Sequence, residues 1–202
     1  MPTDSPLPPA SDPPPPRPRP WPLLATRPGP KLRLFRILHE RRENPRNGHQ
    51  IDALVLDSAD WVNVVPVTPR GEIVFVRQFR FGIRTDTLEI PGGLISRGEE
   101  PLLAARRELR EETGMVARSI RSLGAVEPNP AFLTNLCHQF LAEGVEPAGA
   151  LELDPGEDVV VERHSFAAVR RMVADGTIRH SLVLTALARV LDLRDGSVDS
   201  FR

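Results

Sequence analysis

From residue 31 onward, short apolar runs alternate with turn-forming residues, a pattern that predicts β-strands. One apolar run covers residues 34–38 and a second covers 51–56. Between them, residues 44–48 read Asn-Pro-Arg-Asn-Gly, which is a strong turn signal. We therefore expect residues 33–56 to form a hairpin or a small meander. Further strands are expected at 61–67, 72–81, 119–126, 137–142 and 159–163.

Two helices are expected after the last of these strands, because the chain carries helix start and stop signals there. The first is predicted with Ser165 as its cap and Gly176 as its stop. The second is predicted to begin after Ser181 and to run toward Gly196.

Residues 1–30 differ in composition from the rest of the chain, since 13 of the 22 prolines fall there. Proline removes backbone donors and favours an extended, solvated backbone, so this segment is expected to be a disordered tail. Its end, near residues 21–24, is expected to pack on the following domain. The alternative is that the tail docks into an aromatic-lined groove of another protein, as PxxP ligands do.

Composition sets further limits on the class of protein. The 202 residues suffice for one domain plus an accessory part, and a hydrophobic fraction of 40% can fill a core. A net charge of -1 gives no general attraction to nucleic acid or to an anionic membrane, so neither is expected as a partner. Cys137 is the only cysteine, which excludes an intrachain disulfide and favours a reducing, cytoplasmic location. No apolar run approaches the length of a membrane span.

A cluster of glutamates is the strongest chemical signal in the sequence. It lies on a predicted helix that begins at Pro101 and stops at Gly114. On that helix Glu108 is one turn from both Glu111 and Glu112, so the three carboxylates lean toward one edge and repel one another. Mg²⁺ or Mn²⁺ would remove the conflict, because hard cations prefer carboxylate oxygens. The alternative is a solvated acidic helix face.

The residues around these glutamates resemble the Nudix box at every fixed position. The box runs from Gly93 through Glu99 to Arg107-Glu108-Leu109-x-Glu111-Glu112-x-Gly114-Met115. The resemblance implies hydrolysis of a nucleoside diphosphate linked to another moiety. It also implies an α/β fold, an α/β/α sandwich with a mixed sheet in which the box forms a loop and a helix. A small N-terminal antiparallel β-sheet is expected to precede it, with strands in 31–58 and the hydrolase domain in 59–202.

Within that family, residues 33–93 resemble ADP-ribose pyrophosphatases and related nucleotide-sugar hydrolases. This implies a homodimer in which the N-terminal strands pack across a twofold axis and the active site receives residues from the other subunit. It also implies that Arg80 binds substrate phosphate, which suits the bidentate geometry of a guanidinium. Pro130 matches a proline that those enzymes keep beside the substrate pocket. Ala131 follows it where the relatives have glycine, which favours a broader nucleotide-sugar specificity.

The resemblance also assigns roles within the site. Glu108, Glu111, Glu112 and the backbone carbonyl of Gly92 are expected to hold Mg²⁺, with Mn²⁺ as the other candidate. Glu99 is expected to support these metal ligands, and Arg107 to orient the glutamates by salt bridges. Glu157 is expected to act as general base, or to complete the metal site. Glu89 is expected to support the metal ligands or to contact the sugar.

Several alternatives stay open at this stage. The preferred substrate is ADP-ribose, but GDP-mannose, a dinucleotide or a nucleoside triphosphate would suit the same box. A non-catalytic module that binds such ligands is the alternative of a different class. His138, His164 and His180 lack the spacing of metal ligands and are expected to be structural. Trp61 is expected in the core.

Overall fold

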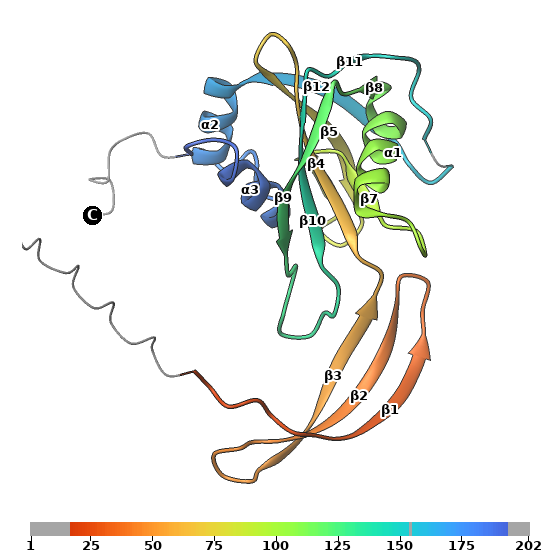
Figure 1. The fold of residues 1–202 in the computed structure, drawn as a ribbon, viewed down its shortest axis with the longest axis vertical. Helices are drawn as coiled ribbons and strands as arrows, with labels where there is room; N and C mark the ends of the chain where they lie inside the picture. Colours follow the sequence, from red (N-terminus) through yellow and green to blue (C-terminus); the bar gives the residue numbers. More distant parts are fainter. Residues whose placement is uncertain (1–16, 154, 194–202) are drawn as a thin grey trace, which may run out of the picture.

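The computed structural model describes residues 17–153 and 155–193, and begins with a small sheet that projects from the rest of the molecule (Figure 1). Strands β1 (Leu23–Lys31), β2 (Phe35–Glu43) and β3 (Gln50–Ser58) pair antiparallel in that order. In the turn between β2 and β3, the Gly48 amide donates to the carbonyl of Asn44 (2.8 Å), and Gly48 has a φ of 73°. The hairpin predicted over residues 33–56 is therefore confirmed, and β1 extends it to a three-stranded meander.

The prediction of a disordered tail over residues 1–30 is wrong for residues 23–30, because they belong to β1. Prolines are tolerated there because β1 is an edge strand, and the pairing with β2 is irregular between Pro28 and Lys31. Just before β1, the carbonyl of Trp21 accepts a hydrogen bond from Arg42 of β2 (3.1 Å). Residues 17–22 of the predicted tail are exposed and form neither helix nor strand, and residues 1–16 lie outside the described residues.

A larger mixed sheet forms the centre of the molecule. Its strand order is β12-β5-β4-β10-β9, with β6 paired to β5 and β7 paired to β4, and only β4 and β10 run parallel. A separate pair joins β8 to β11. The bounds are β4 (Trp61–Val67), β5 (Glu72–Arg80), β6 (Thr85–Glu89), β7 (Gly92–Leu94), β8 (Met115–Val116), β9 (Ser119–Val126), β10 (Cys137–Glu143), β11 (Glu146–Pro147) and β12 (Val159–Ser165).

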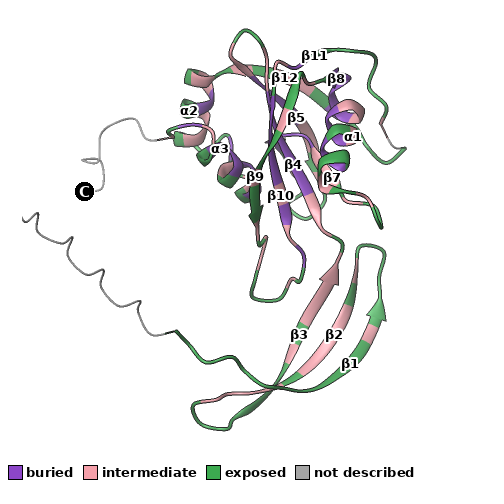
Figure 2. Ribbon diagram, in the orientation of Figure 1, coloured by how far each residue is buried: buried purple, intermediate pink, exposed green. Residues whose placement is uncertain are grey.

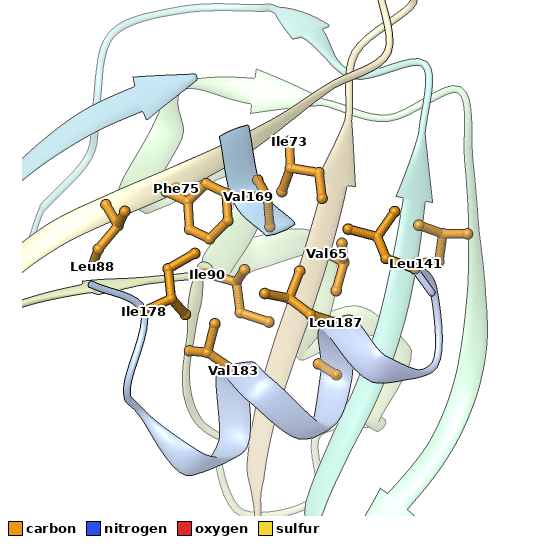
Figure 3. Packing of buried hydrophobic residues seen from close by; sticks show 12 residues of the cluster. Val65, Ile73, Phe75, Leu88, Ile90, Leu141, Val169, Ile178, Val183 and Leu187 are labelled. Carbon is orange, nitrogen blue, oxygen red and sulfur yellow. The ribbon is translucent and has the colours of Figure 1, made fainter. Parts of the chain in front are cut away.

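Helices cover both faces of this sheet, with α1 (Pro101–Thr113) on one side and α2 (Phe166–Ala174) and α3 (Ser181–Ala188) on the other (Figure 1). Side chains alternate along β4, so Val62 and Val64 pack toward α1 while Val65 packs toward α2 and α3. Figure 3 shows the core on the side of α2 and α3, to which Val65 belongs. Figure 2 shows that burial concentrates in β4, β5 and β10. This is the expected α/β/α sandwich preceded by a small antiparallel sheet.

The helix signals were mostly correct. Ser165 caps α2 by accepting a hydrogen bond from the Ala168 amide (3.3 Å), and Gly114 ends α1 in the left-handed conformation. The helix α3 ends at Ala188, well before Gly196, which lies outside the described residues. Within the described part of the chain, no helix has the length and apolar character needed to cross a membrane.

Candidate active site

The acidic edge of α1 faces the short strand β7, and two of its glutamates are buried there. Glu108 is 6% exposed and Glu112 is 3% exposed. The Gly92 amide donates to Glu112 Oε2 (3.0 Å). A Cβ added at Gly93 would come within 2.5 Å of Glu108 Oε1. The loop and helix of the box therefore lie close against the Gly92-Gly93 backbone, and glycine at position 93 makes room for the Glu108 carboxylate.

Arg107 is the centre of an ion-pair network beside these glutamates. Its Nε and Nη2 donate to the two oxygens of Glu99 (2.9 and 3.0 Å). Its Nη1 donates to Glu108 Oε1 (2.7 Å) and to Glu111 Oε2 (2.9 Å). Glu99 in turn accepts from the Ser96 amide (2.9 Å). This geometry fits the expected role of Arg107 in orienting the glutamates, with Glu99 behind it.

Burial disfavours the charged form of both Glu108 and Glu112. Burial raises the pKa of Glu112 to about 8, and Glu108 and Glu157 nearby act in the same direction. Burial also raises the pKa of Glu108, despite its contact with Arg107. A carboxylate buried in this way is stabilised by a nearby cation. The donor set of hard oxygens, with a glycine backbone beside it, therefore fits Mg²⁺ or Mn²⁺.

The side chains are not arranged as a finished coordination shell. Within residues 17–153 and 155–193, no three Asp, Glu, His or Cys side chains lie in position to hold a metal ion as they stand. Glu108 and Glu111 each direct an oxygen to Arg107, and Glu112 directs one to the Gly92 amide.

A cavity of about 630 Å³ lies between the small N-terminal sheet and the mixed sheet. Its polar lining includes Arg80, Glu89, Glu112 and Glu157, together with Gly92 and Gly93. Arg80 donates through Nε and Nη2 to both oxygens of the buried Glu89 (2.7 Å each). The apolar lining comes from both sheets and from the β9–β10 loop: Leu34, Phe35, Leu56, Trp61, Val62, Leu94 and Leu133, with Leu182 of α3.

Pro130 is not among the residues that line this cavity, and Leu133 of the same loop lines it instead. The reason is a local turn. The Asn129 carbonyl accepts from the Leu133 amide (2.9 Å), and its side-chain oxygen accepts from the Ala131 amide (3.2 Å). Pro130 therefore lies at the exposed tip of the turn. The expectation that Pro130 contacts substrate is not supported within this chain.

Two residues that line the cavity were not expected there from the sequence, Trp61 and His180. Trp61 was expected in the core, but it is only half-buried and lines the cavity. His180 was expected to be structural, yet it lines the cavity with its Nε2 3.8 Å from Glu89 Oε2. His180 is the N-cap residue of α3, which begins at Ser181, but its side chain makes no capping hydrogen bond. The other two histidines that were expected to be structural pair with carboxylates, His138 with Asp60 and His164 with Glu162.

Comparison with known proteins agrees with this geometry. The NUDIX domain description matches residues 58–186 of this chain. This chain belongs to the Nudix family. Divalent metal ions are a general requirement of Nudix hydrolases, which accords with the hard oxygen donors on α1.

Individual Nudix proteins match this chain over different lengths. An ADP-ribose pyrophosphatase of Bacillus subtilis (strain 168) is 43% identical over 82 residues, which are 41% of this chain and 44% of that protein. The chain thus spans less than half of that relative. An ADP-ribose pyrophosphatase of Mycobacterium tuberculosis (strain ATCC 25618 / H37Rv) is 30% identical over 154 residues, 74% of each chain.

A solved structure supports the Nudix fold. The crystal structure of an ADP compounds hydrolase superposes with a TM-score of 0.75 at 23% sequence identity. The likeness covers 85% of this chain and 92% of that one, so it extends beyond residues 58–186 of the domain match.

Proposed function

We propose that this Nudix protein hydrolyses the diphosphate bond of a nucleoside diphosphate sugar, with ADP-ribose as its preferred substrate. The products would be a nucleoside monophosphate and a sugar phosphate. The observation that carries the proposal is that one cavity combines groups suited to a metal ion with groups suited to a nucleotide. Buried carboxylates lie on one side of it, and Arg80 with an apolar wall lies on the other. Relatives in two bacteria bear the name ADP-ribose pyrophosphatase, which favours this substrate over GDP-mannose or a dinucleotide.

The acidic edge would hold the metal. Glu108, Glu111, Glu112 and the Gly92 carbonyl would be its ligands, Mg²⁺ being the first candidate and Mn²⁺ the second. When bound, such an ion neutralises phosphate charge and lowers the pKa of bound water. Arg107 keeps Glu108 and Glu111 on one side of α1, and Glu99 fixes Arg107 from behind.

Glu157 would take the proton from the attacking water. It lines the cavity, and it lies near enough to Glu112 and Glu108 to influence the pKa of both. Loss of a general base typically slows a reaction about 10²–10⁴-fold.

Arg80 would bind a phosphate of the substrate while Glu89 orients it. The two bonds to Glu89 use the Nε and Nη2 edge of the guanidinium, so the opposite edge retains N–H groups for phosphate oxygens. The buried Glu89 therefore acts by holding Arg80 in one orientation. Its own contact with a sugar hydroxyl is the alternative that the sequence left open.

The apolar wall would receive the nucleoside. Phe35 comes from the N-terminal sheet, Trp61 from the start of β4, and Leu133 from the β9–β10 loop. Aromatic rings beside an apolar surface suit a nucleobase, which stacks on them. Because part of this wall belongs to residues before the domain match, the N-terminal sheet would contribute to substrate choice.

The working unit would be a homodimer. The three-stranded N-terminal sheet exposes large apolar side chains on both faces: Leu54 on the face that also carries Phe35 and Leu56, and Leu23 and Ile51 on the opposite face. An apolar face on such a small sheet is stabilised when another surface covers it. A second copy of the same sheet would supply that surface. We also propose a cytoplasmic location, because a sequence with a single cysteine, Cys137, suits a reducing compartment.

A panel of nucleotide sugars tests the proposed activity directly. The full chain with Mg²⁺ is expected to release AMP and ribose 5-phosphate from ADP-ribose faster than it cleaves GDP-mannose or a dinucleotide. Glu112→Gln should abolish most of this turnover, whereas Glu146→Gln, the same change on β11, should leave it unchanged. Tight binding of ADP-ribose without release of AMP would instead support the non-catalytic alternative.

A further inference from the structure

The loop between β9 and β10 is attached to the N-terminal sheet by backbone hydrogen bonds. The Leu56 amide of β3 donates to the Phe132 carbonyl (2.8 Å), and the Thr134 amide donates to the Leu56 carbonyl (3.2 Å). Leu56 and Leu133 thereby form an isolated parallel β-bridge. Figure 1 shows this loop reaching from the mixed sheet toward β3. Two segments far apart in the sequence are thus joined at one point.

The joined residues are themselves part of the cavity wall. Leu56 and Leu133 both line the cavity, together with Phe35 of β2. One apolar surface is therefore made from two separate segments, and its shape depends on the register between them. The backbone bridge contributes two hydrogen bonds to this register.

The side chain of Thr134 adds two further hydrogen bonds across this junction. Its hydroxyl donates to Asp57 Oδ1 (3.1 Å) and accepts from the Ser58 amide (3.4 Å). The other oxygen of Asp57 accepts from Arg36 of β2 (2.6 Å). One hydroxyl group therefore links the loop to two successive residues of β3, and through Asp57 to the next strand of the same sheet.

We propose that Thr134 is a positioning residue for nucleoside recognition, which acts by holding Leu133 and Leu56 together as one wall of the cavity. The inference rests on the proposed function, since it assigns this wall to the nucleoside part of the substrate. Without the hydroxyl, Leu133 loses part of its attachment to β3, and the wall fits a nucleobase less closely. The phosphate side is unaffected, because Arg80 lies on β5 and Glu112 on α1.

The test replaces the hydroxyl by a methyl group of similar size. Thr134→Val is expected to raise the KM for ADP-ribose about three- to tenfold, the effect of losing one or two hydrogen bonds of ordinary strength. The kcat should stay within about twofold of the wild-type value, because the groups around the diphosphate are untouched. The inhibition constant for inorganic pyrophosphate, which has no nucleoside, should not change.

Two further variants separate positioning from a general loss of structure. Thr134→Ser keeps the hydroxyl and should restore the wild-type KM. Thr26→Val makes the same chemical change at an exposed position of β1, where no hydrogen bond of the hydroxyl is found in the described part of the chain, and should have no effect. An unchanged KM in Thr134→Val, or a parallel rise in KM and in the pyrophosphate constant, would overturn the proposal.

The role of Thr134 can be tested even if the chain has no hydrolase activity. Should the wild-type chain bind ADP-ribose without cleaving it, calorimetry on the same variants measures their affinity for ADP-ribose. A dissociation constant raised about three- to tenfold by Thr134→Val and restored by Thr134→Ser would then support the inference. Equal affinities in all three proteins would refute it, whatever the fate of the hydrolase activity.

Discussion

Gly93 occupies a position in the site where a side chain would not fit. Its φ lies outside the left-handed region, so the requirement there is one of space rather than of backbone conformation. A Cβ would lie 2.5 Å from Glu108 Oε1 and 2.7 Å from Glu108 Cδ. The carboxylate would have to move, and with it a proposed ligand of the metal.

Gly93→Ala is therefore expected to lower activity and metal affinity together. Displacement of a metal ligand or its support typically costs about 10–100-fold. Gly82→Ala is the matched control, because a Cβ at Gly82 meets no atom within 4 Å. Steady-state rates across a Mg²⁺ titration would show the difference. Equal Mg²⁺ dependence in the two variants would contradict the proposed placement of Glu108.

The residues of the box could be predicted because they act through local geometry. The spacing of Glu108, Glu111 and Glu112 on one helix fixes where they point, whatever the rest of the fold does. Phe35, Leu133 and His180 could not be found in this way. They reach the cavity only through contacts between distant segments, and none of them has a spacing that signals chemistry.

At the scale of elements, the edge strand β12 is joined to β5 by charged side chains as well as by backbone pairing. Arg77 of β5 donates to Glu162 of β12 (2.5 Å) and to Asp86 of β6 (2.8 Å). The hydrogen bond from Arg77 lowers the pKa of Glu162, and a further contact with His164 acts in the same direction. These side chains are partly exposed, so the pair contributes roughly 0.5–1 kcal/mol.

Glu162→Gln should therefore reduce stability in a pH-dependent way. Because the pKa of Glu162 is lowered on folding, its contribution is complete above the unfolded value, about 4.3, and is lost as pH falls through the folded value. Urea unfolding at pH 7 should show the variant about 0.5–1 kcal/mol less stable. The difference should vanish near pH 2. A difference that persists at pH 2 would show that the pair is not its cause.

Most elements were predicted from local patterns, and the exceptions have physical reasons. The bounds of β4 and β9 agree with the predicted strands because their apolar runs end at clear turns. The strand β1 was missed because prolines such as Pro28 argue against a strand, and only its pairing with β2 stabilises it. That pairing is a tertiary contact which the prolines do not reveal.

At the scale of the whole molecule, the small sheet contributes to the cavity yet leaves an apolar face uncovered. Leu54, Leu56 and Phe35 lie on one face, as the pairing of β2 with β3 and the alternation of side chains require. Leu56 and Phe35 line the cavity, whereas Leu54 is 50% exposed. A second copy that covers this sheet would bury Leu54 and extend the wall of the cavity.

Leu54→Glu is expected to convert a dimer into a monomer, because it places a charge in the proposed interface. Light scattering should give twice the chain mass of 22.4 kDa for the wild-type protein and about the single mass for the variant. Leu103→Glu, the same change at an exposed leucine of α1, should remain dimeric. A wild-type protein with the mass of a single chain would contradict the proposed homodimer.

We propose that Glu108 and Glu112 are buried because together they hold a divalent cation. Binding of Mn²⁺ to the full chain, followed by electron paramagnetic resonance with and without ADP-ribose, tests it most directly. We predict specific binding by the wild-type protein, weakened about 10–100-fold in Glu112→Gln and unchanged in Glu146→Gln. Mn²⁺ binding of equal strength in wild type and Glu112→Gln, or no binding in either, would contradict the claim.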